Sequence, residues 1–243
     1  MLDPSILSPD AIASRVLHRD GLMLILDKPA GVPVHAGPKG GPNLEASFGA
    51  LRFGLPRDPA LAHRLDKDTS GCLVLGRHRK ALARLGKLFS SGRIGKTYWA
   101  VVQGAPEADQ GRIDAPLAKR NPNRGWWMAV DPAGLPSVTE WKVMARGAGL
   151  AWIAFTPLTG RTHQIRAHAA HVGMPLLGDP IYGAAPQGGP PLHLHARAVS
   201  VPMRESRPPI EAEAPLPPHM AATFAALDWQ APAPRASSVD EAS

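Results

Sequence analysis

The chain of 243 residues contains one cysteine, Cys72, and few aromatic residues (5%). A single cysteine excludes an internal disulfide framework and a zinc site made of several cysteines. Cys72 lies between Gly71 and an aliphatic run, so we expect it to be a small buried side chain. No hydrophobic run approaches the roughly 18 residues that a membrane-spanning helix requires. The most hydrophobic run, Leu22–Leu26, has the length of a strand.

Acidic residues and secretory features are also scarce. The chain has 20 Asp and Glu against 27 Lys and Arg, which gives a formal net charge of +7. The first residues, Met1–Pro4, contain no cationic segment ahead of a hydrophobic stretch, so we expect no secretory signal and a cytoplasmic location. The positive charge favours a polyanionic partner such as a nucleic acid, although charge alone is a weak indication.

Hydrophobic periodicity and turn residues predict a mixture of strands and helices. The expected strands are 16–19, 22–27, 61–66, 71–77, 98–102, 138–145, 150–156 and 192–200, and the expected helices are 43–53, 77–91, 164–172 and 217–228. The two kinds of element do not alternate regularly, which favours an α+β fold with a mixed or antiparallel sheet. No repeat or linker divides the chain, so we expect one domain over residues 1–230. A Pro-, Ala- and Ser-rich tail at 231–243 is expected to be disordered.

The most informative segment is HRLDKDTSGCLVL, residues 63–75. It places a charged cluster directly before a hydrophobic strand, and therefore a carboxylate at the edge of a core. For Asp68 and Ser70 we favour a polar turn in which the side chains bond to their own backbone. For Asp66, which follows Leu65, the residues alone leave a structural or a functional role open.

Two further segments carry polar side chains at the start of a regular element. In TGRTHQIRAH, residues 159–168, a glycine turn opens a helix with cationic and amide side chains. This suits phosphate or carboxylate binding, and equally a solvated helix start. In RIGKTYWAVV, residues 93–102, Tyr98 stands where a basic turn enters a strand. A tyrosine there is by itself more often packed in a core or interface than catalytic.

Taken in order, HRLDKDTSG, GKTYWAVV, TGRTHQIRAH and GDPIYG resemble the RluA-like family of RNA pseudouridine synthases, and DKPAGVPVH is similar to the family's leading strand and loop. The resemblance covers residues 15–200. It implies a pseudouridine synthase fold, with a mixed, mainly antiparallel sheet, flanking helices and a central basic cleft. It also implies an isomerase that converts selected uridines of RNA to pseudouridine without a cofactor or a metal.

The resemblance also implies roles for individual residues. Asp66 corresponds to the catalytic aspartate, which acts as a nucleophile at C1′ or as a base at C2′, and the sequence leaves both open. A carboxylate in a partly dry pocket needs a nearby cation to stay ionised, and Arg166 matches the family's arginine that pairs with it. Tyr98 matches the tyrosine that packs on the target base and is suited to removing the C5 proton. Ile165 would form part of an apolar wall, and Arg64 would enter the RNA where the uridine flips out.

Further RNA contacts are expected from basic side chains in and near these motifs, namely Lys96, Arg161, His163, Arg84 and Lys87. The last two lie on the basic face of the predicted helix 77–91, together with Arg77 and Lys80. A basic helix face is usually only solvated, but an RNA enzyme can use it to contact phosphates.

Asp66 comes too early in the chain to leave room for the N-terminal S4 RNA-binding domain of larger family members. We therefore expect the compact type, acting as a monomer on large-subunit rRNA, tRNA or both. Substrate choice would then depend on loops such as 37–43 and 104–125. In and after the second loop, basic and aromatic side chains suited to unpaired RNA occur together: Lys119, Arg120, Arg124, Trp126 and Trp127.

Two other classes of function fit parts of the sequence. One is a catalytically silent RNA-binding module, against which the intact set of Asp66, Tyr98 and Arg166 argues. The other is a hydrolase that uses Asp66 and a histidine, but no motif supplies the second catalytic group it would need. Three histidines are crowded in the sequence, and two more share one face of a predicted strand: His163, His168 and His171, and His193 and His195. No HExxH pattern or partner cysteine accompanies them, so we expect packing or RNA contact and no metal.

Overall fold

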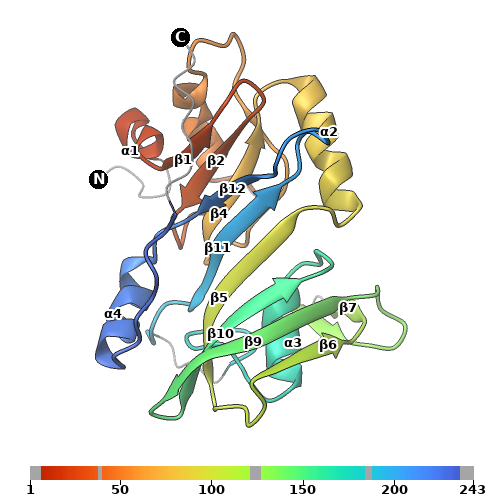
Figure 1. The fold of residues 1–243 in the computed structure, drawn as a ribbon, viewed down its shortest axis with the longest axis vertical. Helices are drawn as coiled ribbons and strands as arrows, with labels where there is room; N and C mark the ends of the chain where they lie inside the picture. The colour runs from red at the N-terminus through yellow and green to blue at the C-terminus, as the bar shows by residue number, and fades with distance from the viewer. Residues whose placement is uncertain (1–6, 38–39, 121–126, 184–187, 236–243) are drawn as a thin grey trace. The chain divides into compact units, whose positions relative to one another are not determined.

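The computed structural model describes residues 7–37, 40–120, 127–183 and 188–235 (Figure 1). The chain forms two compact units. The first consists of Met1–Gly95, Ala196–Pro217 and Ala233–Ser243, and the second of Lys96–His195 and Pro218–Pro232. Residues 236–243 of the predicted tail, and Arg124 and Trp126 of the predicted RNA-binding loop, lie outside the described residues. The prediction of one catalytic domain over residues 1–230 stays a prediction.

The first unit is built on a sheet with strand order β1, β2, β4 and β11, where β12 pairs with β11 and β3 pairs with β4. The strands are β1 (Val16–Arg19), β2 (Met23–Lys28), β3 (Ala60–Leu61), β4 (Ser70–Gly76), β11 (Leu194–Val201, of which the last six residues belong to this unit) and β12 (Ile210–Glu213). The helices are α1 (Pro9–Ala13), the 3₁₀ helix η1 (Leu44–Leu51) and α2 (Arg79–Ser90). The pairs β1–β2, β2–β4, β3–β4 and β11–β12 are all antiparallel.

The expected strands 16–19 and 22–27, which only Asp20 and Gly21 separate, pair as a hairpin, and a side chain closes its turn. The Asp20 carboxylate accepts hydrogen bonds from the backbone N–H groups of Leu22 (2.7 Å) and Met23 (2.8 Å). Further on, the Asn43 side chain accepts from the N–H of Ala46 (3.3 Å), as expected of a helix cap. The helix that follows is a 3₁₀ helix and ends two residues earlier than predicted.

Helix α2 confirms the prediction for 77–91 but begins at Arg79, because His78 provides the cap. The Nδ1 atom of His78 accepts a hydrogen bond from the N–H of Ala81 (3.2 Å). Ala81, Leu85 and Leu88 then pack into one hydrophobic cluster with residues of β2 and β4. The guanidinium of Arg77 donates to the backbone carbonyls of Asp20, Arg52 and Phe53. The assignment of Arg77 to the basic helix face was therefore wrong.

The predicted strand 61–66 was also wrong, because only Ala60–Leu61 pairs with β4. The N–H of Ala62 still donates to the carbonyl of Val74 (3.1 Å). The N–H of Val74, however, donates to the Nε2 atom of the His63 ring (3.0 Å) and not to a carbonyl of a continuing strand. The ring satisfies the donor that the strand would have used, so the chain can turn away from the sheet at this point.

The second unit contains a sheet with strand order β5, β10, β9 and β6, and a separate hairpin of β7 and β8. These strands are β5 (Gly95–Gln103), β6 (Gln110–Asp114), β7 (Leu117–Arg120), β8 (Trp127–Val130), β9 (Val138–Gly147) and β10 (Leu150–Pro157), and the helices are α3 (Gln164–His171) and α4 (Pro218–Ala226). Every pair is antiparallel. The prediction of an irregular loop over 104–125 was wrong where β6 and β7 lie.

The core of the second unit lies between α3 and the sheet. Ile165 and Ala169 of α3 pack with Ala100, Ile153 and Phe155, which belong to β5 and β10. Helix α4 is attached to this unit through aromatic rings, since Phe224 lies 4.7 Å from Trp152 between ring centroids.

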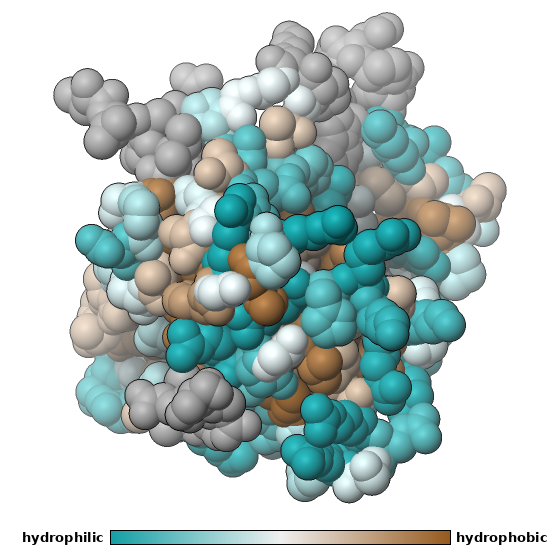
Figure 2. All heavy atoms as spheres, turned by 90° about the horizontal axis from the view of Figure 1, so that it is seen from above, coloured by the Kyte–Doolittle hydropathy of each residue, from teal (hydrophilic) through white to brown (hydrophobic). Residues whose placement is uncertain are grey.

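The predicted α+β fold with a mainly antiparallel sheet is confirmed, and the central basic cleft stays a prediction. On the face drawn in Figure 2, hydrophilic residues predominate and hydrophobic residues form small separate patches. Among the described residues, no helix is long and apolar enough to cross a membrane.

Candidate active site

Asp66 lies in the first unit, in the turn that joins β3 to β4. Its backbone carbonyl accepts a hydrogen bond from the N–H of Thr69 (3.2 Å), which closes the turn. Leu65 on one side and Thr69 and Ser70 on the other are buried, whereas the Asp66 side chain is half-buried. Asp66 is thus held by buried neighbours and still reaches the surface. Arg64, two residues earlier, is exposed, with its guanidinium 3.3 Å from the His35 ring.

A fully buried lysine anchors the turn that carries Asp66. The ammonium group of Lys28, at the end of β2, donates to the carbonyl oxygens of Pro29 (2.7 Å), Val32 (2.8 Å) and Lys67 (2.9 Å). Burial lowers the pKa of Lys28 to about 7, while the negative charges of Asp68, Asp66 and Asp27 act in the opposite direction. Lys28 therefore joins the DKPAGVPVH segment to the Asp66 turn, and its amine interacts electrostatically with Asp66.

We expect Lys28→Met to reduce the free energy of unfolding by about 3 kcal/mol, because three carbonyls would lose their donor and the contact to Lys67 joins segments 39 residues apart. Denaturant unfolding measures this loss. Lys67→Met is the matched control, since the Lys67 side chain is exposed and only its carbonyl receives the bond. Equal unfolding free energies for the two variants would contradict the anchoring role.

In the second unit, Tyr98 and Ile165 belong to one neighbourhood. Tyr98 of β5 pairs with Phe155 of β10 and packs against the hydrophobic cluster that contains Ile165 of α3. The amine of Lys96, two residues before Tyr98, lies 3.9 Å from the position that a Cβ on Gly160 would take, so it is next to the turn that precedes α3. Burial lowers the pKa of Lys96. The structure therefore places Tyr98 and Ile165 in one hydrophobic cluster and Lys96 beside the turn that precedes α3.

The turn before α3 is held mainly by Gln164. The Oε1 atom of Gln164 accepts hydrogen bonds from the hydroxyl of Thr159 (2.7 Å) and the N–H of Arg161 (3.0 Å), while Nε2 donates to the carbonyl of Val138 (2.9 Å). His163 precedes the helix with a positive φ of 51°. The side chain of Arg161 is exposed, and its Nε atom donates to the carbonyl of Pro136 (3.3 Å).

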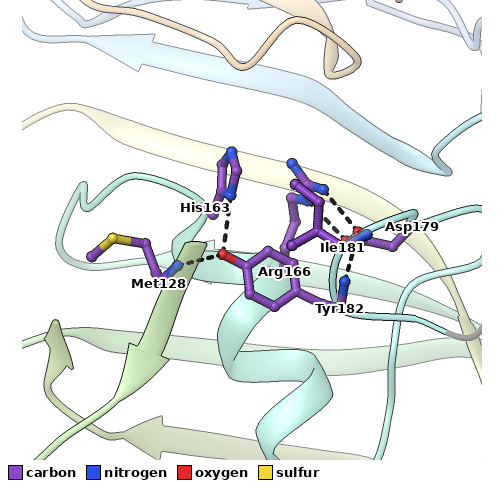
Figure 3. Close-up of polar contacts among 6 residues, drawn as sticks. All are labelled: Met128, His163, Arg166, Asp179, Ile181 and Tyr182. Atoms are coloured by element: carbon purple, nitrogen blue, oxygen red, sulfur yellow. Dashed lines mark hydrogen bonds and ion pairs between the residues drawn. The ribbon is translucent and has the colours of Figure 1, made fainter. Parts of the chain in front are cut away.

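Arg166 forms a buried two-pronged ion pair with Asp179 (Figure 3). Its Nε and Nη2 atoms each donate to one carboxylate oxygen at 2.8 Å, and the side chains are 3% and 0% exposed. The carboxylate also accepts from the N–H groups of Ile181 (2.9 Å) and Tyr182 (3.1 Å). Burial alone would raise the pKa of Asp179, but the bonds and charge of Arg166 and the two N–H groups hold it below its usual range. The pair thus contributes stability that is lost as the pH falls through this lowered pKa.

Tyr182 links this ion pair to the hairpin and to His163. Its ring lies under the Arg166 guanidinium, 5.3 Å from carbon to centroid. Its hydroxyl accepts from the N–H of Met128 in β8 (2.8 Å) and lies 3.0 Å from Nδ1 of His163, as Figure 3 shows. His163, Arg166, Asp179 and Tyr182 therefore form one connected polar network inside the second unit.

Two of the histidines considered for a metal site have structural partners on both ring nitrogens. His168 contacts the hydroxyl of Thr139 and the carbonyl of Ala115, each at 2.9 Å. His193 contacts the carbonyl of Pro191 (2.7 Å) and the hydroxyl of Thr223 (2.8 Å). Burial lowers the pKa of both imidazoles. No group of three or more metal-ligating side chains occurs within the part of the chain that the structure describes.

A family model described as RNA pseudouridylate synthase matches residues 22–171, a span that includes Asp66, Tyr98 and Arg166. The chain belongs to this family. It is an RNA pseudouridine synthase, an isomerase of RNA uridines, and the RluA-like resemblance of its motifs is confirmed.

Named relatives cover most of this RNA pseudouridine synthase. An uncharacterized RNA pseudouridine synthase of Zymomonas mobilis is 45% identical over 209 residues, which is 85% of this chain and 95% of that protein. Ribosomal large subunit pseudouridine synthase D of Xanthomonas campestris is 37% identical over 90% of this chain and 71% of its own length. The solved structure of human RNA pseudouridylate synthase domain containing 4 has a TM-score of 0.77 at 24% identity, covering 93% of this chain and 97% of that one, and shows the shared fold.

The predicted site residues of the synthase are divided between the two units. Asp66, Arg64, Arg84 and Lys87 belong to the first, and Lys96, Tyr98, Arg161, His163, Ile165 and Arg166 to the second. The pairing of Asp66 with Arg166 and the place of Tyr98 beside the base stay predictions. Lys28, His63, Asp179 and Tyr182 lie within the family motifs, but the motifs predict no role for them. Their contacts are with backbone groups or distant segments, for which the sequence holds no local signal.

Proposed function

We propose that this RNA pseudouridine synthase isomerises specific uridines of large-subunit rRNA or tRNA, with Asp66 as the catalytic carboxylate. The observation that carries the proposal is the position of Asp66, half-buried in a turn that is held by Lys28 and by the Thr69–Asp66 bond. The relatives named for the ribosomal large subunit support rRNA as the first substrate to test.

The reaction rearranges bonds within one nucleotide. The bond between C1′ and N1 breaks, the uracil turns, C5 bonds to C1′, and the proton on C5 leaves while N1 gains one. Asp66 can attack C1′ as a nucleophile or remove the proton at C2′, and either step requires an ionised carboxylate. We assign Arg166 to pair with Asp66, Tyr98 to pack on the base and accept the C5 proton, and Ile165 to line the pocket. Arg64 is assigned to the gap left by the flipped uridine.

The experiment is to map pseudouridine after incubating purified protein with unmodified large-subunit rRNA and with unmodified tRNA. We expect new pseudouridine at a small number of sites in one of the two RNAs, located where the uridine is unpaired, because flipping an unpaired base costs least. The same sites should lose pseudouridine in cells that lack the protein. No new pseudouridine in either RNA would reject the proposed substrates. We further propose that the protein acts in the cytoplasm, as a monomer and without a cofactor.

We expect Tyr98→Phe to bind RNA normally but to form product about 100-fold more slowly. Phenylalanine keeps the ring that packs on the base and removes the hydroxyl that accepts or relays the C5 proton. A single-turnover assay at saturating RNA measures the effect. Tyr182→Phe is a control for losing a tyrosine hydroxyl, because its bond to Met128 N–H lies in the structural network and its loss should lower stability by about 1 kcal/mol. Full activity of Tyr98→Phe would leave Tyr98 a packing role only.

We expect Arg84→Ala to weaken RNA binding and to make its salt dependence less steep by about 0.7–0.9 in the logarithmic slope, as for one lost phosphate contact. Arg84 and Lys87 are exposed on α2, and Lys80 lies on the same helix. Arg112→Ala is the control, since this exposed arginine of β6 already faces the carboxylates of Glu140 and Asp114. Binding titrations over a range of salt concentrations would show equal slopes for both variants if α2 does not contact RNA.

A further inference from the structure

The turn that carries Asp66 leaves the sheet at the end of β3 and returns to it as β4, the strand with which β3 pairs. Leu61 of β3 pairs with Leu75 of β4, and the chain re-enters β4 at Ser70. Between these points, the N–H of Ala62 makes the last backbone hydrogen bond to β4, to the carbonyl of Val74. Asp66 follows only four residues later. The path of the chain directly after Ala62 therefore decides where the carboxylate lies.

The His63 ring fixes that path from two sides. Its Nε2 atom accepts the Val74 N–H at 3.0 Å, in the place where an antiparallel partner strand would offer a carbonyl. Its face stacks on the Phe89 ring of α2, with centroids 4.4 Å apart and an angle of 27° between the planes. Because the accepting nitrogen carries no proton, the contact requires a neutral ring protonated on Nδ1. The strand and the helix thus hold one side chain three residues before Asp66.

We propose that His63 is a positioning residue for Asp66 and that its contact with Val74 sets the carboxylate at the distance and angle that the uridine requires. This inference rests on the proposed catalytic role of Asp66. Misplacing a reacting group by about 1 Å can cost on the order of 100-fold in rate even when the fold is intact. The Lys28–Lys67 contact holds the turn on the other side of Asp66, so loss of His63 loosens the turn without releasing it.

The test compares three variants in single turnover at saturating, prefolded RNA, with RNA affinity and melting temperature measured alongside. His63→Leu removes the acceptor nitrogen and keeps an apolar side chain against Phe89. His63→Gln keeps an acceptor, Oε1, at about the reach of Nε2. His78→Leu is the matched control, because the His78 ring also accepts a backbone N–H, that of Ala81 at 3.2 Å, but caps α2 instead of the Asp66 turn.

We expect His63→Leu to slow the saturated rate by about 10- to 100-fold with RNA affinity within about threefold of wild type. His63→Gln should recover most of the rate. His78→Leu should lower the melting temperature about as much as His63→Leu does, while keeping the wild-type rate. A wild-type rate for His63→Leu overturns the inference. So does a rate loss in His78→Leu of the same size, because a general loss of stability would then explain both.

Two further comparisons keep the test decisive. If His63→Leu does not fold, His63→Gln and His63→Asn are compared, because both are amides and only glutamine reaches the position of Nε2. A faster rate for glutamine supports the inference, and equal rates overturn it. The proposed function has its own test in Asp66→Asn. If that variant is inactive and His63→Leu is fully active, the positioning role fails while the catalytic role of Asp66 stands.

Discussion

Asp66→Asn is expected to reduce pseudouridine formation by more than 100-fold while the protein still folds and still binds RNA. Asparagine has the size and shape of aspartate but carries no negative charge, so it can neither attack C1′ nor take a proton from C2′. In the proposal Asp66 is the only carboxylate that reacts, so its loss removes the nucleophile or base itself and not merely one stabilising contact. A large decrease in the rate is therefore expected. Single-turnover assays at saturating RNA, with quantified pseudouridine, measure it.

The turn itself offers a matched control for this substitution. Asp68 lies two residues further on, is also half-buried and acts on Lys28 with the same sign as Asp66. Asp68→Asn removes an equal charge from the same turn, and we expect it to retain most of the activity. Residual turnover of Asp66→Asn above about a hundredth of the wild-type rate would reject Asp66 as the catalytic residue. Equal losses in both variants would mean that the turn needs its charge and not a particular carboxylate.

Features of the sequence with a local physical cause could be predicted. The Asp20 turn and the Asn43 cap each depend on residues within three positions of one another, and the structure contains both. The family motifs were likewise recognisable because each is a short continuous run. Their order along the chain identified the family before any contact was known.

Features that depend on one side chain meeting a distant backbone group could not be predicted. Residues 61–66 have the apolar spacing of a strand, yet the ring of His63 ends the pairing by binding Val74, eleven residues away. Arg77 has the spacing of the basic helix face, yet it binds carbonyls 24, 25 and 57 residues away. In both cases a tertiary contact outweighs the local pattern, and the periodicity of the sequence carries no record of it.

The partner of Arg166 is the clearest example with consequences for the site. The family resemblance predicts an arginine that serves a catalytic carboxylate, whereas the structure shows that a second carboxylate, Asp179, already holds this arginine by two hydrogen bonds. Arg166 therefore has a fixed orientation inside its own unit. Its charge is also partly offset by the Asp179 carboxylate.

This arrangement predicts pH effects of opposite sign for the two members of the pair. If Arg166 pairs with Asp66 as proposed, a variant with a weaker pair, such as Arg166→Lys, favours the protonated form of the catalytic carboxylate. The acidic limb of the pH–rate profile then moves to higher pH. Asp179→Asn removes the negative charge that offsets Arg166, so the acidic limb should move to lower pH. Asparagine still offers a side-chain oxygen to the N–H groups of Ile181 and Tyr182, which helps to preserve the local fold.

Arg166→Lys is the informative arginine variant, because Arg166→Ala would leave the fully buried Asp179 without a cation and cost about 3–5 kcal/mol of stability. Lysine keeps the charge but cannot reproduce the planar two-pronged contact, so we expect a folded protein with a saturated rate reduced by about 10- to 100-fold. The pH–rate profiles of Arg166→Lys and Asp179→Asn, measured with RNA affinity, decide the role. If both variants change only RNA affinity and leave the saturated rate and the acidic limb unchanged, Arg166 is a phosphate contact and the assigned pairing with Asp66 is wrong.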